Sequence, residues 1–300
     1  MTTLTAGMGG ETPRWSDLAA MARAAEDLGF DSVWVGDRLL GDGEHGMWEC
    51  TTLLAALARE TSRVEIGSLV IRAIYRNPAL TAKIANTLDE ISGGRFVLGL
   101  GVGPDGGENE RLGYPEDHPI GRFEEALAII RGLLRCGNLN FEGTYYRVRD
   151  WELEPRGPSE HGPPVLVAAR TPRVLRLAAR NADLWQTYLS YRKDDQKEIV
   201  RQQEEADAAC EAEGRDPATL ERTGFVQVDA SNRPEGSPVA ESLEKFGYGG
   251  PPISGGPEEI ADAFRVLAGL GFSQLHLWPT PNSLGGIEVI GRALEILDRG

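Results

Sequence analysis

Residues 63–103 read RVEIGSLVIRAIYRNPALTAKIANTLDEISGGRFVLGLGVG, and this stretch contains the pattern that decides the fold. Two short apolar runs, at 64–71 and 96–101, flank a segment whose apolar residues recur every three or four positions from Leu80 to Ile91. Continuous apolar runs bounded by glycine are typical of strands that are buried on both faces of a parallel sheet. The stretch therefore predicts a strand–helix–strand unit.

The same unit repeats along the rest of the chain. Further runs that predict strands occur at 32–37, 164–168, 183–187, 224–228 and 273–278, with a weak, polar one at 3–8. Eight such units with no linker between them predict an α/β fold, a single (β/α)8 TIM barrel over residues 1–300. A doubly wound sheet is disfavoured, because no glycine-rich fingerprint stands near the start. Two segments interrupt the repeat: an insertion near residues 137–163 that predicts a hairpin, and a long loop at 231–257.

Composition excludes several classes of protein. Aspartate and glutamate (46) outnumber lysine and arginine (31), so the net charge is −15. Such a surface does not suit nucleic acid or anionic membranes. No apolar run approaches the roughly 20 residues of a membrane helix, and no export signal is seen at the N-terminus. The three cysteines, Cys50, Cys136 and Cys210, form no CxxC motif, so we expect reduced thiols in a soluble, cytoplasmic protein.

Candidate site residues follow the predicted strands, because the active site of such a barrel lies at the carboxyl ends of its strands. Asp37 and Arg38 come directly after the strand at 32–37, and His45 and Trp48 follow in the loop. An aspartate beside an arginine is often only a structural ion pair. Its position at a strand end raises the expectation of a role in the site.

A second candidate is the glycine-rich segment that follows the strand at 96–101. It runs from Gly101 through Gly103 to Gly107 and continues into Glu108 and Asn109. Glycines allow the backbone to approach a ligand closely, although a tight turn explains them equally well.

A third candidate is the segment Ala168-Ala169-Arg170-Thr171, which precedes a proline that opens a helix. Free N–H groups, the helix dipole and the guanidinium would together form an anion site, and an ordinary helix cap is the alternative. Trp185 and Trp278 also lie at strand ends. They either cover the core or line a pocket for a planar ligand.

Other chemistries are disfavoured. The four histidines form neither HxH nor HExxH, so we expect no metal site. No GxSxG elbow and no Walker motif is present, and no lysine lies in a predicted strand. What remains is a site in which a cofactor carries out the difficult chemistry.

The chain resembles the bacterial luciferase-like monooxygenase family, which includes reductases and dehydrogenases that depend on the deazaflavin coenzyme F-420. Residues 63–103 carry the resemblance, supported by GFDSVWVGD at 29–37, ExLGYP at 110–115 and VAARTPRVLRLAARNADLW at 167–185. The resemblance implies a TIM-like barrel, often with a non-prolyl cis peptide against the central flavin ring. That bond would be Leu69–Val70, or Ser68–Leu69 if the correspondence with the family is shifted by one residue.

The resemblance also implies site residues. The catalytic candidates are Asp37, Arg38, His45 and Glu108. The cofactor-binding candidates are Asp37, Ser68, Leu69, Val70, Gly101, Gly103, Gly107, Asn109, Ala168, Ala169, Arg170 and Thr171, the last four around the phosphate. The substrate-pocket candidates are Trp48, Trp185 and Trp278.

One departure from the family concerns the proton donor. Deazaflavin enzymes of the family typically show Asp-His where this chain has Asp37-Arg38. Either His45 or Glu108 takes the acid role, Arg38 polarises the substrate, or the reaction differs.

The expected function is hydride transfer between reduced F-420 and a small organic substrate. The alternatives are an FMN-dependent monooxygenase, whose FMNH₂ comes from a partner reductase and which uses oxygen, and a non-catalytic flavin-binding protein. The family resemblance also implies a homodimer.

Overall fold

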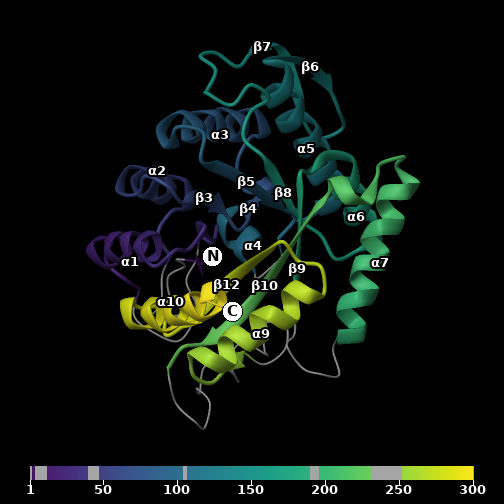
Figure 1. Cartoon of the computed structure of the whole chain (residues 1–300). Coiled ribbons are helices and arrows are strands. Elements are labelled where there is room, and N and C mark those ends of the chain that lie inside the picture. The colour runs from purple at the N-terminus through teal and green to yellow at the C-terminus, as the bar shows by residue number, and fades with distance from the viewer. Residues whose placement is uncertain are drawn as a thin grey trace.

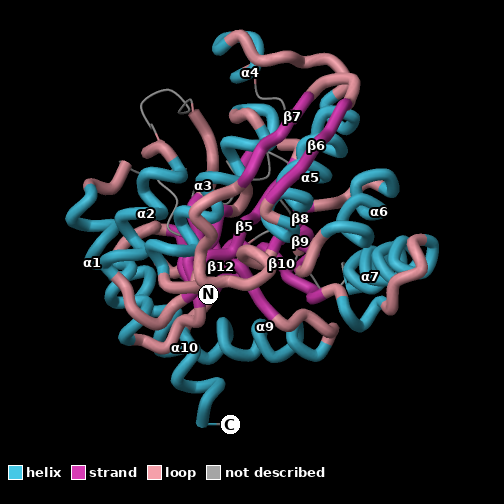
Figure 2. Tube along the Cα trace, turned by 90° about the horizontal axis from the view of Figure 1, so that it is seen from above, coloured by secondary structure: helices cyan, strands magenta, loops and turns pink. Residues whose placement is uncertain are grey.

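The computed structural model describes residues 2–3, 12–39, 47–103, 107–189, 196–231 and 252–299. Within these residues, strands gather at the centre and helices surround them, as Figures 1 and 2 show from two directions. The α/β class expected from the sequence is confirmed.

The central sheet consists of parallel strands. They are β1 (Thr2–Thr3), β2 (Ser32–Val35), β3 (Glu65–Ser68), β4 (Ile71–Arg72), β5 (Phe96–Gly101), β8 (Val165–Ala168), β9 (Leu184–Tyr188), β10 (Glu221–Asp229), β11 (Ile253–Ser254) and β12 (Gln274–Thr280). Their order is β1-β2-β3-β5-β8-β9-β10-β11, with β12 also pairing β10 and β4 pairing β5. β1 lies next to β12, so the sheet curls round on itself.

The helices lie between the strands in sequence. They are α1 (Trp15–Asp27), α2 (Cys50–Glu60), α3 (Pro78–Ser92), α4 (Glu108–Leu112), α5 (Pro119–Cys136), α6 (Pro172–Asn181), α7 (Gln196–Ala212), α9 (Pro257–Gly269) and α10 (Leu284–Arg299), with 3-10 turns η1 (Ala73–Tyr75) and η3 (Pro217–Thr219). Local chemistry sets their ends. Asn77 accepts the N–H of Ala79, Pro78 opens α3, and Gly93 ends it in the left-handed conformation at φ 68°.

The inner face of the curled sheet carries its own packed cluster. Trp34, Val97, Leu166 and Leu184, which come from four different strands, contact one another there. Gly67 must be glycine, because a Cβ at this position would lie 2.2 Å from the Trp34 ring. Below the carboxyl ends of the strands, the buried Gln186, Thr223 and His276 form a polar group on the same face. Residues on this face therefore come together from all sides of the sheet.

The structure divides the expected strand at 64–71 into β3 and β4. The Leu69–Val70 peptide bond between them is cis, which confirms the position expected from the family resemblance. Ser68 donates its hydroxyl to the Gly99 carbonyl at 2.9 Å, and a Cβ on Gly99 would lie 1.9 Å from the Ser68 carbonyl oxygen. The close approach of the two strands thus requires glycine at position 99.

The expected hairpin in 137–163 is confirmed as the antiparallel pair β6 (Asn138–Glu142) and β7 (Arg147–Glu152). It projects from the helix layer beside α5 (Figure 1). Glu125 of α5 accepts the backbone N–H groups of Thr144, Tyr145 and Tyr146, which fixes the tip of the hairpin.

The expected loop at 231–257 is only partly described, because residues 232–251 lie outside the described part of the chain. At its end the expectation was wrong: Ile253 and Ser254 form β11, which pairs with Val228 and Asp229. Two isolated residues with few apolar neighbours give no periodic pattern from which a strand could be read. Of the weak strand at 3–8, only Thr3 is described.

Candidate functional site

The parallel strands end at one edge of the sheet, which we call the carboxyl edge. Asp37 follows β2 there, Arg72 ends β4, Gly101 ends β5 and Ala168 ends β8. Because parallel strands share their direction, residues that are far apart in sequence meet at this edge.

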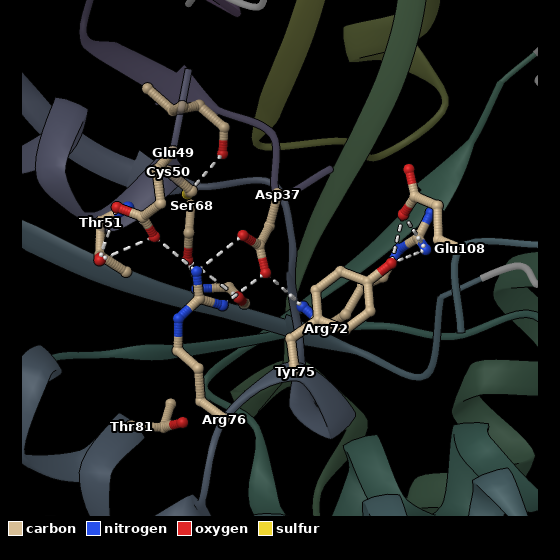
Figure 3. Close-up of polar contacts among 12 residues, drawn as sticks. Asp37, Glu49, Cys50, Thr51, Ser68, Arg72, Tyr75, Arg76, Thr81 and Glu108 are labelled. Atoms are coloured by element: carbon tan, nitrogen blue, oxygen red, sulfur yellow. Dashed lines mark hydrogen bonds and ion pairs between the residues drawn. The ribbon is translucent and has the colours of Figure 1, made fainter. Parts of the chain in front are cut away.

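Asp37 is held by an arginine that lies 39 residues further along the chain. Arg76 donates from Nη1 to Oδ2 at 2.7 Å and from Nη2 to Oδ1 at 2.9 Å, as Figure 3 shows. The backbone N–H of Arg72 adds a bond to Oδ2 at 3.2 Å. Asp37 is 4% exposed, so this paired carboxylate is buried. The ion pair considered for Asp37 exists, but its partner is Arg76 rather than the adjacent Arg38.

Glu49 is the second carboxylate bound by Arg76, at 2.6 Å. It also caps α2, because its side chain accepts the N–H groups of Thr51 and Thr52. Burial raises the pKa of Glu49, but these hydrogen bonds outweigh burial and lower the pKa to about 2. Burial lowers the pKa of Arg76, and its bonds to Asp37 and Glu49 raise it above the ordinary value. Both partners therefore stay charged at neutral pH.

Glu108 lies at the start of α4 and is 2% exposed. Its Oε2 accepts from Nη1 of Arg72 at 2.8 Å and from the Tyr75 hydroxyl, and its Oε1 lies 3.4 Å from Nε of Arg38. Burial and the Glu108 carboxylate raise the pKa of Tyr75 above its ordinary value. The end of the glycine-rich segment is thereby tied to the turn that follows β4.

Arg72 joins the two groups. Its backbone binds Asp37 and its guanidinium binds Glu108, so one residue positions both carboxylates that the sequence analysis singled out. Arg72, Tyr75 and Arg76 are not among the site residues expected from the sequence. Their position at 72–76, directly after a predicted strand, could have indicated that they belong to the site.

The residues around the cis bond and the glycine segment come together as expected. Leu69 and Val70 pack against the cluster on the inner face. A Cβ added to Gly101 would lie 2.8 Å from Cγ2 of Val70 and 3.7 Å from Cβ of Ala168. A Cβ on Gly103 would meet the Arg72 side chain at 2.8 Å. Glycine at these two positions thus allows Val70 and Arg72 to pack directly against the backbone that follows β5.

Asn109 has an unused acceptor beside Gly103. Its Oδ1 atom is buried and has no hydrogen-bond partner among the described residues. Asn109 lines a pocket of about 110 Å³ together with Arg72, Val102, Gly103 and Arg122. A buried acceptor without a donor is costly unless a ligand supplies the donor.

The Ala168–Thr171 segment leads into α6, which opens with Pro172 as expected. Thr171 occupies the cap position, but its side chain makes no capping hydrogen bond. Ala169 and Arg170 line a pocket of about 60 Å³ against Gln202 and Arg201 of α7. The anion site remains a prediction.

The tryptophans expected to line one pocket do not lie together. Trp48 is 44% exposed and donates to the Pro13 carbonyl at 2.8 Å. Trp185 is 1% exposed, donates to the Ala169 carbonyl at 2.9 Å and lies against Arg222. Trp278 packs edge-on against Phe225, with ring centroids 5.7 Å apart.

A different aromatic cluster occupies the carboxyl edge. The Tyr188 and Phe225 rings lie 5.2 Å apart, next to Trp278, and the Arg170 guanidinium lies 5.9 Å from the Tyr188 ring centroid. From the sequence, Tyr188 is expected at a strand end together with Trp185 and Trp278, as an aromatic residue that either covers the core or lines a pocket, whereas Phe225 is not expected there. Alternation along each strand would have placed them on the inner face. His45 lies outside the described residues.

Among the described residues, no helix is long and apolar enough to cross a membrane. No three of the described histidine, cysteine, aspartate or glutamate side chains gather as metal ligands would.

Comparison with known proteins identifies relatives. The family model described as luciferase-like monooxygenase matches residues 1–237. The F420-dependent glucose-6-phosphate dehydrogenase of Amycolatopsis mediterranei is 37% identical over 174 residues, which cover 56% of this chain and 51% of that protein. The chain thus matches about half the length of this curated relative.

Solved structures share the fold at low sequence identity. An F420-dependent secondary alcohol dehydrogenase in complex with an F420-acetone adduct superposes with a TM-score of 0.81 at 19% identity, covering 98% of this chain and 97% of that one. The monooxygenase RslO1 from Streptomyces bottropensis superposes with a TM-score of 0.78 at 21% identity, covering 93% and 92%.

Proposed function

The chain belongs to the luciferase-like monooxygenase family, and from this we propose that it transfers a hydride between bound coenzyme F-420 and a small organic substrate. The observation that carries the proposal is that Val70, Gly101 and Ala168, which come from three parts of the sequence, pack together at the carboxyl edge. We also propose that the curled sheet closes into a (β/α)8 barrel through β1 and β12.

The described residues fit a deazaflavin. Gly101 and Ala168 project no large side chain at the carboxyl edge, where a flat ring system would lie, and a Cβ on Gly101 would meet Cγ2 of Val70 at 2.8 Å. The unpartnered Oδ1 of Asn109 can accept a hydrogen bond from a polar ligand group. The start of α6, with Arg170 beside it, suits the phosphate of the cofactor side chain.

The bound cofactor would supply the chemistry, because a reduced deazaflavin donates a hydride and an oxidised one accepts it. The chain itself supplies position. Arg76 and Arg72 fix Asp37, and Arg72 and Tyr75 fix Glu108, so neither carboxylate swings freely. Arg38, beside Glu108, is placed to polarise a substrate oxygen and cannot itself be deprotonated.

The second candidate is an FMN-dependent monooxygenase, since a monooxygenase shares the fold over nearly the whole chain. Flavin and deazaflavin differ at one ring atom, so residues that hold one ring system can hold the other. Only the deazaflavin lacks the nitrogen at position 5, so the two candidates differ in their reaction with oxygen.

Fluorescence titration of the whole protein tests the proposal. We expect quenching of F-420 at micromolar concentrations and weaker quenching of FMN. Tighter binding of FMN together with oxygen uptake in the presence of FMNH₂ would favour the monooxygenase. Binding of neither at tens of micromolar would refute both.

A further inference from the structure

The carboxylates at the β2–β5 side of the carboxyl edge are neutralised by arginine. Asp37 and Glu49 both bind Arg76, and Glu108 binds Arg72. Each of these three carboxylates therefore already has a charged arginine partner among the described residues.

Asp229 differs from all of them. It is 2% exposed, and its Oδ2 atom is buried without a hydrogen-bond partner among the described residues. Its Oδ1 atom accepts the backbone N–H of Ser231 at 3.0 Å and the Ser231 hydroxyl at 2.5 Å. No lysine or arginine among the described residues forms an ion pair with Asp229. A buried carboxylate oxygen without any donor is costly, and such costs persist where a ligand uses the group.

The position of Asp229 places this oxygen above the aromatic cluster. Side chains alternate along β10, so Asp229 shares the inner face with Thr223 and Phe225. Phe225 pairs with Tyr188, the last residue of β9, so β10 continues for four residues beyond its neighbour. At about 3.3 Å per residue, Asp229 lies roughly 13 Å further along the strand than Phe225. It therefore lies on the side where a substrate would enter.

We propose that Oδ2 of Asp229 binds the hydroxyl group of an alcohol substrate and accepts its proton during hydride transfer. The inference rests on the proposed function, in which oxidised deazaflavin is the hydride acceptor. The O–H bond breaks and its proton passes to Oδ2, while the hydride leaves the carbinol carbon for the deazaflavin. The alcohol becomes a ketone and the deazaflavin is reduced; ketone reduction runs the same steps backwards.

Ser231 has a positioning role in this scheme. Both its N–H and its hydroxyl bind Oδ1, which leaves Oδ2 as the oxygen directed to the substrate. Removal of the hydroxyl in Ser231→Ala leaves one bond to Oδ1, so we expect a smaller loss of turnover than at Asp229 itself.

The test compares Asp229→Asn with wild type in three measurements. F-420 affinity, read by fluorescence, should be unchanged. Thermal unfolding of the protein without cofactor should occur at an equal or higher temperature, because the asparagine keeps an oxygen for the two Ser231 bonds and removes the unpartnered acceptor. Reduction of F-420 by 2-propanol or cyclohexanol should fall about 10²–10⁴-fold, as for loss of a general base.

Asp216→Asn is the matched control. Asp216 makes the same kind of bond, to the N–H of Ala218 at 3.0 Å, but it is exposed at the start of η3. We expect wild-type turnover in this variant.

Each outcome separates the two proposals. Wild-type protein that binds no F-420 refutes the proposed function and with it the inference. Wild-type protein that binds F-420 but oxidises neither alcohol refutes only the alcohol class. Full turnover in Asp229→Asn, or unfolding of that variant at a clearly lower temperature with weakened F-420 binding, shows a structural role and overturns the inference.

Discussion

Arg76 binds the carboxylate of Asp37 through both terminal nitrogens of its guanidinium, although the two residues are 39 positions apart in the sequence. This geometry is the strongest form of an arginine–carboxylate pair. It brings the segment after β2 against the turn after β4, and the same guanidinium reaches Glu49 at the start of α2.

Because Arg76 pairs with the buried Asp37, we expect Arg76→Gln to lower the free energy of unfolding strongly. The substitution leaves the buried Asp37 without its charged partner, and such losses cost about 3–5 kcal/mol. Denaturant unfolding monitored by circular dichroism measures the change. Arg23→Gln, which breaks an exposed pair with Glu60, is the control and should cost less than about 1 kcal/mol. Equal effects of the two substitutions would contradict this account.

Glu26 predicts a pH dependence of stability. Burial raises its pKa, but bonds from the N–H groups of Ser62, Arg63 and Val64 lower the pKa to about 2. A group whose pKa is lowered by folding stabilises the protein at pH values above its ordinary pKa of 4.5. This contribution disappears as the pH falls from 4.5 towards 2. Unfolding free energies of wild type and Glu26→Gln should therefore converge over that interval. A difference that is independent of pH would show that the carboxylate charge plays no part.

We expect a substitution at Asn109 to weaken F-420 binding without lowering the stability of the protein. Its Oδ1 has no partner among the described residues, so Asn109→Ala should leave the unfolding temperature close to wild type. If F-420 supplies the donor, its dissociation constant should rise about 5–10-fold, equivalent to about 1 kcal/mol.

Asn140→Ala is the control for this separation. The Asn140 Oδ1 accepts the N–H of Asp150 at 2.8 Å in the hairpin. Loss of that bond should lower stability and leave F-420 affinity unchanged. The reverse pattern in the two variants would exclude Asn109 from the cofactor site.

Tyr75 predicts an effect on the position of α4. In Tyr75→Phe, Glu108 loses a hydroxyl donor but keeps Arg72, so the loss should be about 1–3 kcal/mol of stability. Because Glu108 opens the helix after the glycine segment, F-420 affinity should fall as well. Combined measurement of urea unfolding and F-420 quenching checks both. Unchanged affinity would show that this bond does not hold the segment in place.

Much of the fold follows from local patterns. The amphipathic helix Pro78–Ser92 and the apolar strand Phe96–Gly101 each bury their own apolar residues, so periodicity within the segment is sufficient to predict them. The break between β3 and β4 has no such local signal. Its position at Leu69–Val70 came from family resemblance, because nothing in the residue types distinguishes a cis bond there.

The sequence predicted where the residues of the candidate site lie, but not which side chains they contact. The ends of strands identified Asp37, Gly101 and Ala168, since parallel strands share one carboxyl edge. They did not show that Trp48 and Trp185 lie apart from Trp278, which depends on side-chain direction and on the helices packed outside.

The amino-acid sequence by itself determined the α/β class, the order of the elements and the edge at which polar residues gather, because short-range periodicity and chain direction are enough to set them. Only the tertiary structure decided which charges neutralise one another. Arg76 reaches back 39 residues to Asp37, Arg72 reaches forward 36 to Glu108, and Asp229 is left with an oxygen that no described side chain satisfies. Ion pairs of this kind depend on distances of a few ångströms between segments far apart in sequence, and those distances exist only once the sheet has curled and the helices have packed around it.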